Sequence, residues 1–166
     1  MHVLIAGAGL GGPALALSLA RHGIRSTIYE IRPRPSNAGG SITLASSAIR
    51  VLDNPVGVHD TLREVGYTYT RMGAHSDDGY KFGDVMVGDT KEGDYPAIRI
   101  LRTDLQKVLL DACDSQNGLV EIKWNAIVEE IRESEQGVAM TFADGTSVQG
   151  MSRTAILPSS PYGCIG

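Results

Sequence analysis

Three glycines near the start of the chain have the spacing of a phosphate-binding turn. Gly7, Gly9 and Gly12 fall in the pattern G-x-G-x-x-G. In such a turn the first glycine allows a tight bend, the second lets the backbone approach a pyrophosphate, and the third lets a helix pack closely on a strand. Glu30 follows at close to the usual spacing of about 20 residues, where a carboxylate accepts hydrogen bonds from both ribose hydroxyls. Together these residues predict a dinucleotide site, although the glycines alone would also suit an empty turn and Glu30 alone a solvated strand end.

The segments around these residues predict the elements that would position them. The apolar strand His2–Ala6 suits the interior of a parallel sheet. A helix is expected from about Pro13 to His22, because proline is tolerated in a first helical turn and Gly23 suits the position after a helix end. A second strand, Ser26–Glu30, completes a βαβ unit of the expected length of roughly 30 residues.

The uncharged run from residue 3 to residue 20 has a competing interpretation. By length alone it would suit a membrane span or the apolar part of a secretion signal. However, no Lys or Arg precedes the run, and four glycines and Pro13 interrupt it. The pattern therefore favours the βαβ unit, and we expect no association with a membrane.

The overall composition predicts one soluble globular domain and narrows the kinds of partner. The chain has 166 residues, of which 42% are hydrophobic and 20% charged, and its net charge is -4. No basic cluster is present that would attract nucleic acid. Cys113 and Cys164 form no C-x-x-C pair and the four histidines have no ligand-like spacing, so we expect neither a disulfide nor a metal site. Such cysteine use is typical of a reducing compartment, which predicts a cytoplasmic location.

Three segments resemble one enzyme family. The first is an extended form of the glycine pattern, in which Ala16 and Gly23 follow Gly12. The second is the glycine-containing loop Ala38–Leu44, and the third is the pattern R-x-x-L-x-x-x-L within Ile100–Leu109. These segments resemble the single-component FAD-dependent monooxygenases of the aromatic-hydroxylase type, which include salicylate and para-hydroxybenzoate hydroxylases and many fungal secondary-metabolite enzymes.

The resemblance implies further cofactor contacts. The loop Ala38–Leu44 would run near the flavin side of the cofactor, which makes Gly40 and Thr43 candidate contacts, although a surface loop rich in proline and glycine would look the same. Arg102, the arginine of the R-x-x-L-x-x-x-L pattern, matches a family arginine that contacts the flavin cofactor; a solvated arginine is the alternative.

The segment after Arg102 can also be interpreted from its residues alone. Thr103 followed by Gln106 has the spacing of a capping box, so a helix is expected to begin there and to end before Asn117-Gly118. Arg102 would then lie just outside the N-terminus of that helix, where its guanidinium could reach a ribose or a phosphate oxygen.

The remaining pattern completes the predicted fold class, which is α/β. We expect a Rossmann-like FAD/NAD(P)-binding fold that combines a parallel sheet, containing the βαβ unit, with an antiparallel β meander, incomplete relative to the family. Trp124 is expected in the core. The expected short helices cover residues 44–52 and 58–65, and the other expected strands cover 67–74, 81–87, 120–124, 126–133, 138–142 and 147–149.

The resemblance covers residues 1–150, which we interpret as a partial FAD-binding domain. Residues 151–166 contain two prolines, three serines and no Asp-Gly, so an irregular tail that departs from the family is expected there. We expect this chain to lack the substrate domain of the family. We expect a truncated or misspliced product that binds FAD weakly.

The resemblance implies a function but no acid, base or nucleophile. The expected cofactor is FAD, with NAD(P)H as co-substrate, and the expected reaction is the O2-dependent hydroxylation of an aromatic or secondary-metabolite-like small molecule. No catalytic residue can be nominated, and the oligomeric state is open. Two alternatives use the same glycines: a non-catalytic FAD- or nucleotide-binding fragment, and an NAD-dependent dehydrogenase-type domain.

Overall fold

The computed structural model describes residues 1–35, 39–88, 95–134, 137–150 and 155–156. The chain divides into two compact units. Unit 1 combines Met1–Asn37 with Gln106–Gly166, and unit 2 consists of Ala38–Leu105. The predicted fold class is confirmed, because a parallel sheet and antiparallel strands are both present.

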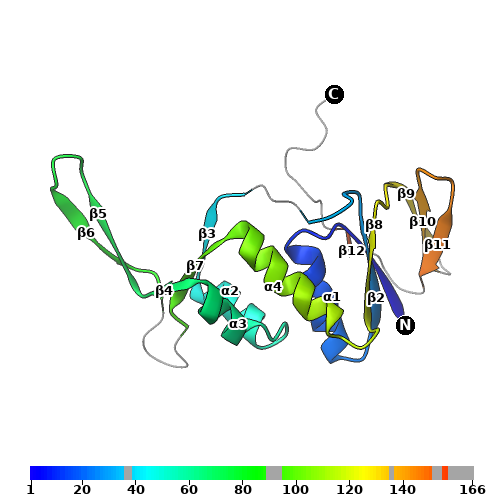
Figure 1. Cartoon of the computed structure of the whole chain (residues 1–166), viewed down its shortest axis with the longest axis horizontal. Coiled ribbons are helices and arrows are strands. Elements are labelled where there is room, and N and C mark those ends of the chain that lie inside the picture. Colours follow the sequence, from blue (N-terminus) through cyan, green and yellow to red (C-terminus); the bar gives the residue numbers. More distant parts are fainter. Residues whose placement is uncertain (36–38, 89–94, 135–136, 151–154, 157–166) are drawn as a thin grey trace. The chain divides into compact units, whose positions relative to one another are not determined.

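A parallel sheet is the centre of unit 1. Its strand order is β12-β1-β2-β8, and its register pairs Val3 with Ser26 and Ser26 with Val120. Helix α1 connects β1 to β2 and packs against β1, β2 and β8 (Figure 1). The bounds of these elements are β1 His2–Ala6, α1 Gly11–Arg21, β2 Arg25–Glu30, β8 Val120–Trp124 and β12 Ala155–Ile156.

The other face of this sheet is covered by an antiparallel meander. The meander has the order β11-β10-β9, built from β9 Val128–Ser134, β10 Gly137–Phe142 and β11 Ser147–Gly150. Leu4 and Tyr29 of the parallel sheet pack with Met140 and Phe142 of β10 in one buried cluster. Because both faces of β1 are covered, the consecutive residues Val3, Leu4 and Ile5 are all apolar and buried instead of alternating with polar residues.

Unit 2 is built around a small antiparallel sheet of order β3-β7-β4. Helices α2 and α3 pack on each other, and β5 and β6 form a separate hairpin that is drawn as a long green ribbon (Figure 1). The bounds are β3 Ser41–Leu44, α2 Ser46–Asp53, α3 His59–Val65, β4 Tyr67–Tyr69, β5 Arg71–His75, β6 Lys81–Met86 and β7 Ala97–Leu101. Helix α4, Arg102–Asp114, follows β7 directly, and the boundary between the units falls within it.

Several predictions need correction in unit 2. Ser41–Leu44 forms a strand, where the sequence indicated only a loop, because each of its residues pairs with β7. The strand predicted over residues 67–74 breaks at Thr70 into β4 and β5, which belong to different sheets. Ala38 lies outside the described residues.

Two predictions need correction in unit 1. Ala155 and Ile156 form a short strand parallel to β1, where irregular chain was expected; the rest of residues 151–166 lies outside the described residues. Trp124 is half-buried rather than part of the core, because it is the last residue of β8. Residues 3–20 divide into β1, a loop and α1, and no helix in the described ranges combines the length and the apolar character that crossing a bilayer requires.

Candidate functional site

The loop between β1 and α1 bends at Gly7. Its φ of 101° lies in the region that favours glycine, and its N–H donates a hydrogen bond to the Tyr29 carbonyl oxygen at 2.8 Å. The loop is therefore tied to the neighbouring strand β2 at its first residue. The turn role that the sequence predicts for Gly7 is confirmed by this geometry.

Gly12 lies where the first turn of α1 meets the loop. An ideal Cβ at this position would lie 2.0 Å from the Gly7 carbonyl oxygen and 3.4 Å from Cγ2 of Ile5. No side chain fits at such distances, so the close packing predicted for Gly12 is confirmed. The helix begins at Gly11, two residues earlier than predicted, and Pro13 is in its first turn.

Gly9 is surrounded by open space instead. An ideal Cβ at Gly9 would have no atom within 4 Å. The adjacent N-terminus of α1 offers the N–H groups of Gly11 and Gly12, because the first amides of a helix have no acceptor within it. Pro13 has no N–H, and the Ala14 N–H already donates to the Leu10 carbonyl oxygen. No acidic residue lies in this first turn, so the positive end of the helix dipole is free to attract a phosphate.

Glu30 ends strand β2 with its carboxylate directed at the same loop. The residue is only 2% exposed. Its Oε2 accepts a hydrogen bond from the Ala8 N–H at 2.7 Å, and its Oε1 accepts one from the Arg32 N–H at 3.0 Å. A carboxylate can accept about four hydrogen bonds, so each oxygen retains capacity for a ribose hydroxyl.

Gln106 reaches the loop from helix α4, a contact that the sequence did not predict. Its Nε2 donates a hydrogen bond to the Ala8 carbonyl oxygen at 2.7 Å. The capping-box pattern assigned this side chain to the helix start at Thr103, whereas the helix begins at Arg102. A usable signal was present in the sequence. The buried Leu109, Leu110 and Cys113 follow Gln106 at the i+3, i+4 and i+7 positions, so Gln106 is a polar residue on an apolar helix face.

The other predicted site residues lie in unit 2. The Arg102 N–H donates a hydrogen bond to the Gly40 carbonyl oxygen at 3.0 Å, so these two residues are adjacent. Thr43 is on strand β3, paired with Arg99, and its exposed hydroxyl is bonded to the Tyr69 hydroxyl at 2.9 Å. Four predicted residues therefore gather in unit 1 and three in unit 2: Gly7, Gly9, Gly12 and Glu30, and Arg102, Gly40 and Thr43.

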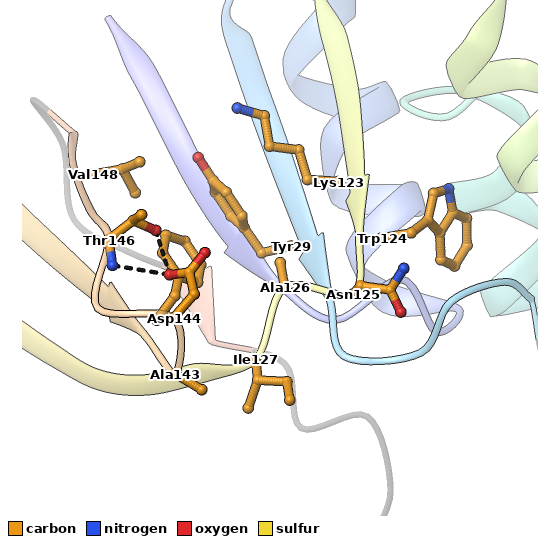
Figure 2. Close-up of a pocket in the computed structure, with 11 residues that line it drawn as sticks. Tyr29, Lys123, Trp124, Asn125, Ala126, Ile127, Ala143, Asp144, Thr146 and Val148 are labelled. Carbon is orange, nitrogen blue, oxygen red and sulfur yellow. Dashed lines mark hydrogen bonds between the residues drawn. The ribbon is translucent and has the colours of Figure 1, made fainter.

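A separate pocket of about 270 Å³ lies in unit 1 between the parallel sheet and the β10–β11 turn. Figure 2 shows Tyr29 next to this turn, and the Lys123 Nζ lies 5.9 Å from the centre of the Tyr29 ring. Within the turn, Asp144 accepts hydrogen bonds from the amide and the hydroxyl of Thr146. Burial, reinforced by the Glu121 carboxylate, raises the pKa of the Tyr29 hydroxyl. Trp124 also lines the pocket, but none of the predicted site residues does.

Two further features of the described part of the chain concern metal-ligating side chains and the cysteine thiol. In the part of the chain that the structure describes, no three His, Cys, Asp or Glu residues lie close enough together to hold a metal ion. Cys113 is a free, 1% exposed thiol on α4, and burial raises its pKa to about 12. A thiol that stays protonated is a poor nucleophile. The groups that converge on the glycine loop are backbone amides, the Glu30 carboxylate and the Gln106 side-chain amide.

Comparison with known proteins agrees with this arrangement. A protein-family model described as "FAD binding domain" matches residues 1–153, three residues beyond the predicted boundary. The 3-hydroxybenzoate 6-hydroxylase 1 of Aquipseudomonas alcaligenes is 32% identical over 154 residues, which cover 90% of this chain and 38% of that protein. The 6-hydroxynicotinate 3-monooxygenase of Pseudomonas fluorescens is 28% identical over 151 residues, which cover 87% of this chain and 37% of that protein.

Solved structures agree in fold. The p-nitrophenol 4-monooxygenase PnpA of Pseudomonas putida DLL-E4 superposes with a TM-score of 0.81 at 22% identity, over 93% of this chain and 40% of that one. At this identity the likeness concerns the fold alone. The chain thus spans less than two fifths of the length of the two curated relatives named above.

Proposed function

Because the chain belongs to the FAD binding domain family, we propose that it supplies the FAD-binding part of an NAD(P)H- and O2-dependent monooxygenase. The proposed substrate is an aromatic or related small molecule, in keeping with relatives named as hydroxylases of hydroxybenzoate and hydroxynicotinate. The observation that carries the binding proposal is the open space at Gly9, between the N-terminus of α1 and the Glu30 carboxylate.

The residues of unit 1 fit the adenosine diphosphate half of the cofactor. The pyrophosphate would approach the backbone at Gly9, where no side chain intervenes, and would accept hydrogen bonds from amides of the first turn of α1. Glu30 would accept hydrogen bonds from the ribose hydroxyls with the capacity its two oxygens retain. A 2′-phosphate on that ribose would be repelled by the same carboxylate.

The residues of unit 2 are proposed contacts for the remainder of the cofactor. By resemblance to the family, Arg102 would contact the flavin cofactor, and Gly40 and Thr43 would lie near its flavin side. The bond between the Arg102 amide and the Gly40 carbonyl keeps these two residues adjacent, which supports a shared role. Bound FAD would supply the redox chemistry, and the protein would bind the cofactor, orient it and exclude water.

The family match favours FAD over NAD as the dinucleotide. The alternative, a non-catalytic nucleotide-binding fragment, would use the same binding residues, Arg102 included, so it differs from the monooxygenase proposal in turnover rather than in binding. The buried free thiol of Cys113 supports the further proposal of a cytoplasmic location, where thiols stay reduced.

The test is a binding and turnover experiment on the whole chain. FAD, ADP and NAD are titrated by calorimetry, and NADPH oxidation is followed with and without a phenolic substrate. We expect FAD and ADP to bind, and we expect Gly9→Val and Glu30→Ala to weaken both by tenfold or more, since each alters a direct ligand contact. A chain that binds NAD but not FAD, or variants that leave both affinities unchanged, would contradict the proposal.

A further inference from the structure

Ala8, which lies between Gly7 and Gly9, has both backbone polar groups bonded to side chains from distant parts of unit 1. Its N–H donates to Glu30 and its carbonyl oxygen accepts from Gln106, each at 2.7 Å. Ala8 itself is completely buried, so water does not compete for either bond. The peptide groups on both sides of Ala8 are therefore held by two side chains that lie 22 and 98 residues away along the chain.

Gln106 would be costly to bury without this bond. Gln106 is only 6% exposed, and moving a primary amide out of water is unfavourable unless its polar groups are hydrogen-bonded. The buried polar or charged residues in the described part of the chain are Ser26, Thr27, Glu30 and Gln106. Of these, Glu30 and Gln106 bond to Ala8. Two of the four buried polar or charged residues in the described part of the chain therefore bond to the glycine loop.

A loop with glycines on both sides of one residue needs such restraint. Glycine loses more conformational freedom on ordering than any other residue, and a loop that is already ordered gives up less on binding. Resting on the proposed function, we infer that Gln106 is a positioning residue of the dinucleotide site. Its amide fixes the Ala8 peptide, so that Gly9 and the first turn of α1 stand in place before the ligand arrives. Gln106 acts through Ala8. In the R-x-x-L-x-x-x-L pattern, residue 106 falls at one of the positions marked x, where the pattern requires no particular residue.

The first experiment removes the donor and keeps the bulk of the side chain. Gln106→Met is compared with Gln116→Met, because Gln116 also donates from Nε2 to a backbone carbonyl, that of Ala112 at 2.9 Å, away from the loop. We expect Gln106→Met to bind ADP about tenfold more weakly than the wild type, since a buried carbonyl loses its partner. Gln116→Met should bind ADP normally. Equal affinities in all three proteins, or the same loss in both variants, would overturn the inference.

A second variant separates positioning from general loss of structure. In Gln106→Glu the protonated carboxyl can donate to the Ala8 carbonyl, whereas the ionised carboxylate cannot. We expect its ADP affinity, relative to that of the wild type, to recover as the pH falls from about 8 to about 5.5, because burial favours the protonated acid. A ratio that stays constant over this range would contradict a donor role for residue 106.

Amide hydrogen exchange decides the inference independently of any ligand. Loss of the Gln106 bond should speed exchange of the Ala8 and Gly9 amides about tenfold or more, while amides in β2 exchange at the wild-type rate. If the wild type binds neither FAD nor ADP, the proposed function fails, but faster exchange confined to the loop still supports the positioning role. Unchanged exchange at Ala8 and Gly9 refutes it.

Discussion

Gly9 and Gly12 differ sharply in the space around them, and substitution should separate binding from stability. Gly12→Ala places a Cβ against the Gly7 carbonyl oxygen, so we expect it to lower the free energy of unfolding by at least about 2 kcal/mol. Gly9→Ala meets no atom within 4 Å, so stability should change by less than about 1 kcal/mol while ADP affinity falls. Urea denaturation and ADP titration of both variants measure the two effects.

The two variants control for each other, because each makes the same chemical change and the two positions are three residues apart. Equal destabilisation by both would mean that the contact between Gly12 and Gly7 does not limit the packing of α1. Full ADP affinity in Gly9→Ala would mean that the open space at Gly9 is not where the pyrophosphate approaches.

At the residue scale, the sequence predicted the contacts that depend on local spacing. Gly7 and Gly12 were assigned correctly because a tight bend and a close helix approach leave a fixed pattern of glycines. Gln106 was assigned to a capping box because its spacing from Thr103 fits one, whereas its partner in the structure, Ala8, is distant in sequence. Only folding brings that pair together.

At the element scale, the chain turns away after helix α1 at a residue that needs glycine. Gly23 has a φ of 68°, and its N–H donates to the Ala20 carbonyl at 2.9 Å, which closes the last turn. We expect Gly23→Ala to lower the free energy of unfolding by about 1 kcal/mol, because a Cβ disfavours this left-handed conformation. Gly23→Asn should cost less, since asparagine tolerates it. Thermal or urea unfolding ranks the three proteins, and the reverse order for the two variants would contradict this explanation.

The sequence predicted best those strands whose hydrophobic pattern is set by burial in the sheet. Strands β1 and β8 match their predicted bounds, and β1 is an apolar run because both faces of the sheet are covered. Strand β3 follows a glycine pair and has only four residues. A strand this short does not show the alternation of apolar and polar residues clearly enough to be predicted. Strands β4 and β5 are separated by one residue, so the alternating pattern of residues across both predicted a single strand.

At the scale of the whole molecule, the division into two units was not predictable from local patterns. Unit 1 is discontinuous: strand β8 pairs with β2 although all of unit 2 lies between them in the sequence. The predicted single domain over residues 1–150 followed the order of motifs along the chain. Pairing across such a distance is a property of the folded sheet, and no residue within unit 2 signals it.

At the same scale, the buried thiol of Cys113 should make the free energy of unfolding depend on pH in the alkaline range. Burial raises the pKa of its thiol from 9.0 to about 12, so the folded state favours the protonated form more than the unfolded state does. The stabilisation this provides is fully present below about pH 9, the unfolded value, and is lost as the pH rises toward 12. Urea unfolding at intervals over this range should therefore show a falling free energy.

Cys113→Ala isolates the contribution of the thiol from that of other groups. The variant should be less stable at neutral pH, because it leaves a cavity beside Pro13, whose carbonyl oxygen lies 3.7 Å from the sulfur. Its stability should nevertheless fall less steeply above pH 9, since the group that titrates is gone. Tyr29, whose pKa burial also raises, contributes equally to both proteins and cancels in the difference. Parallel curves for the two proteins would show that the buried thiol is not what limits stability at high pH.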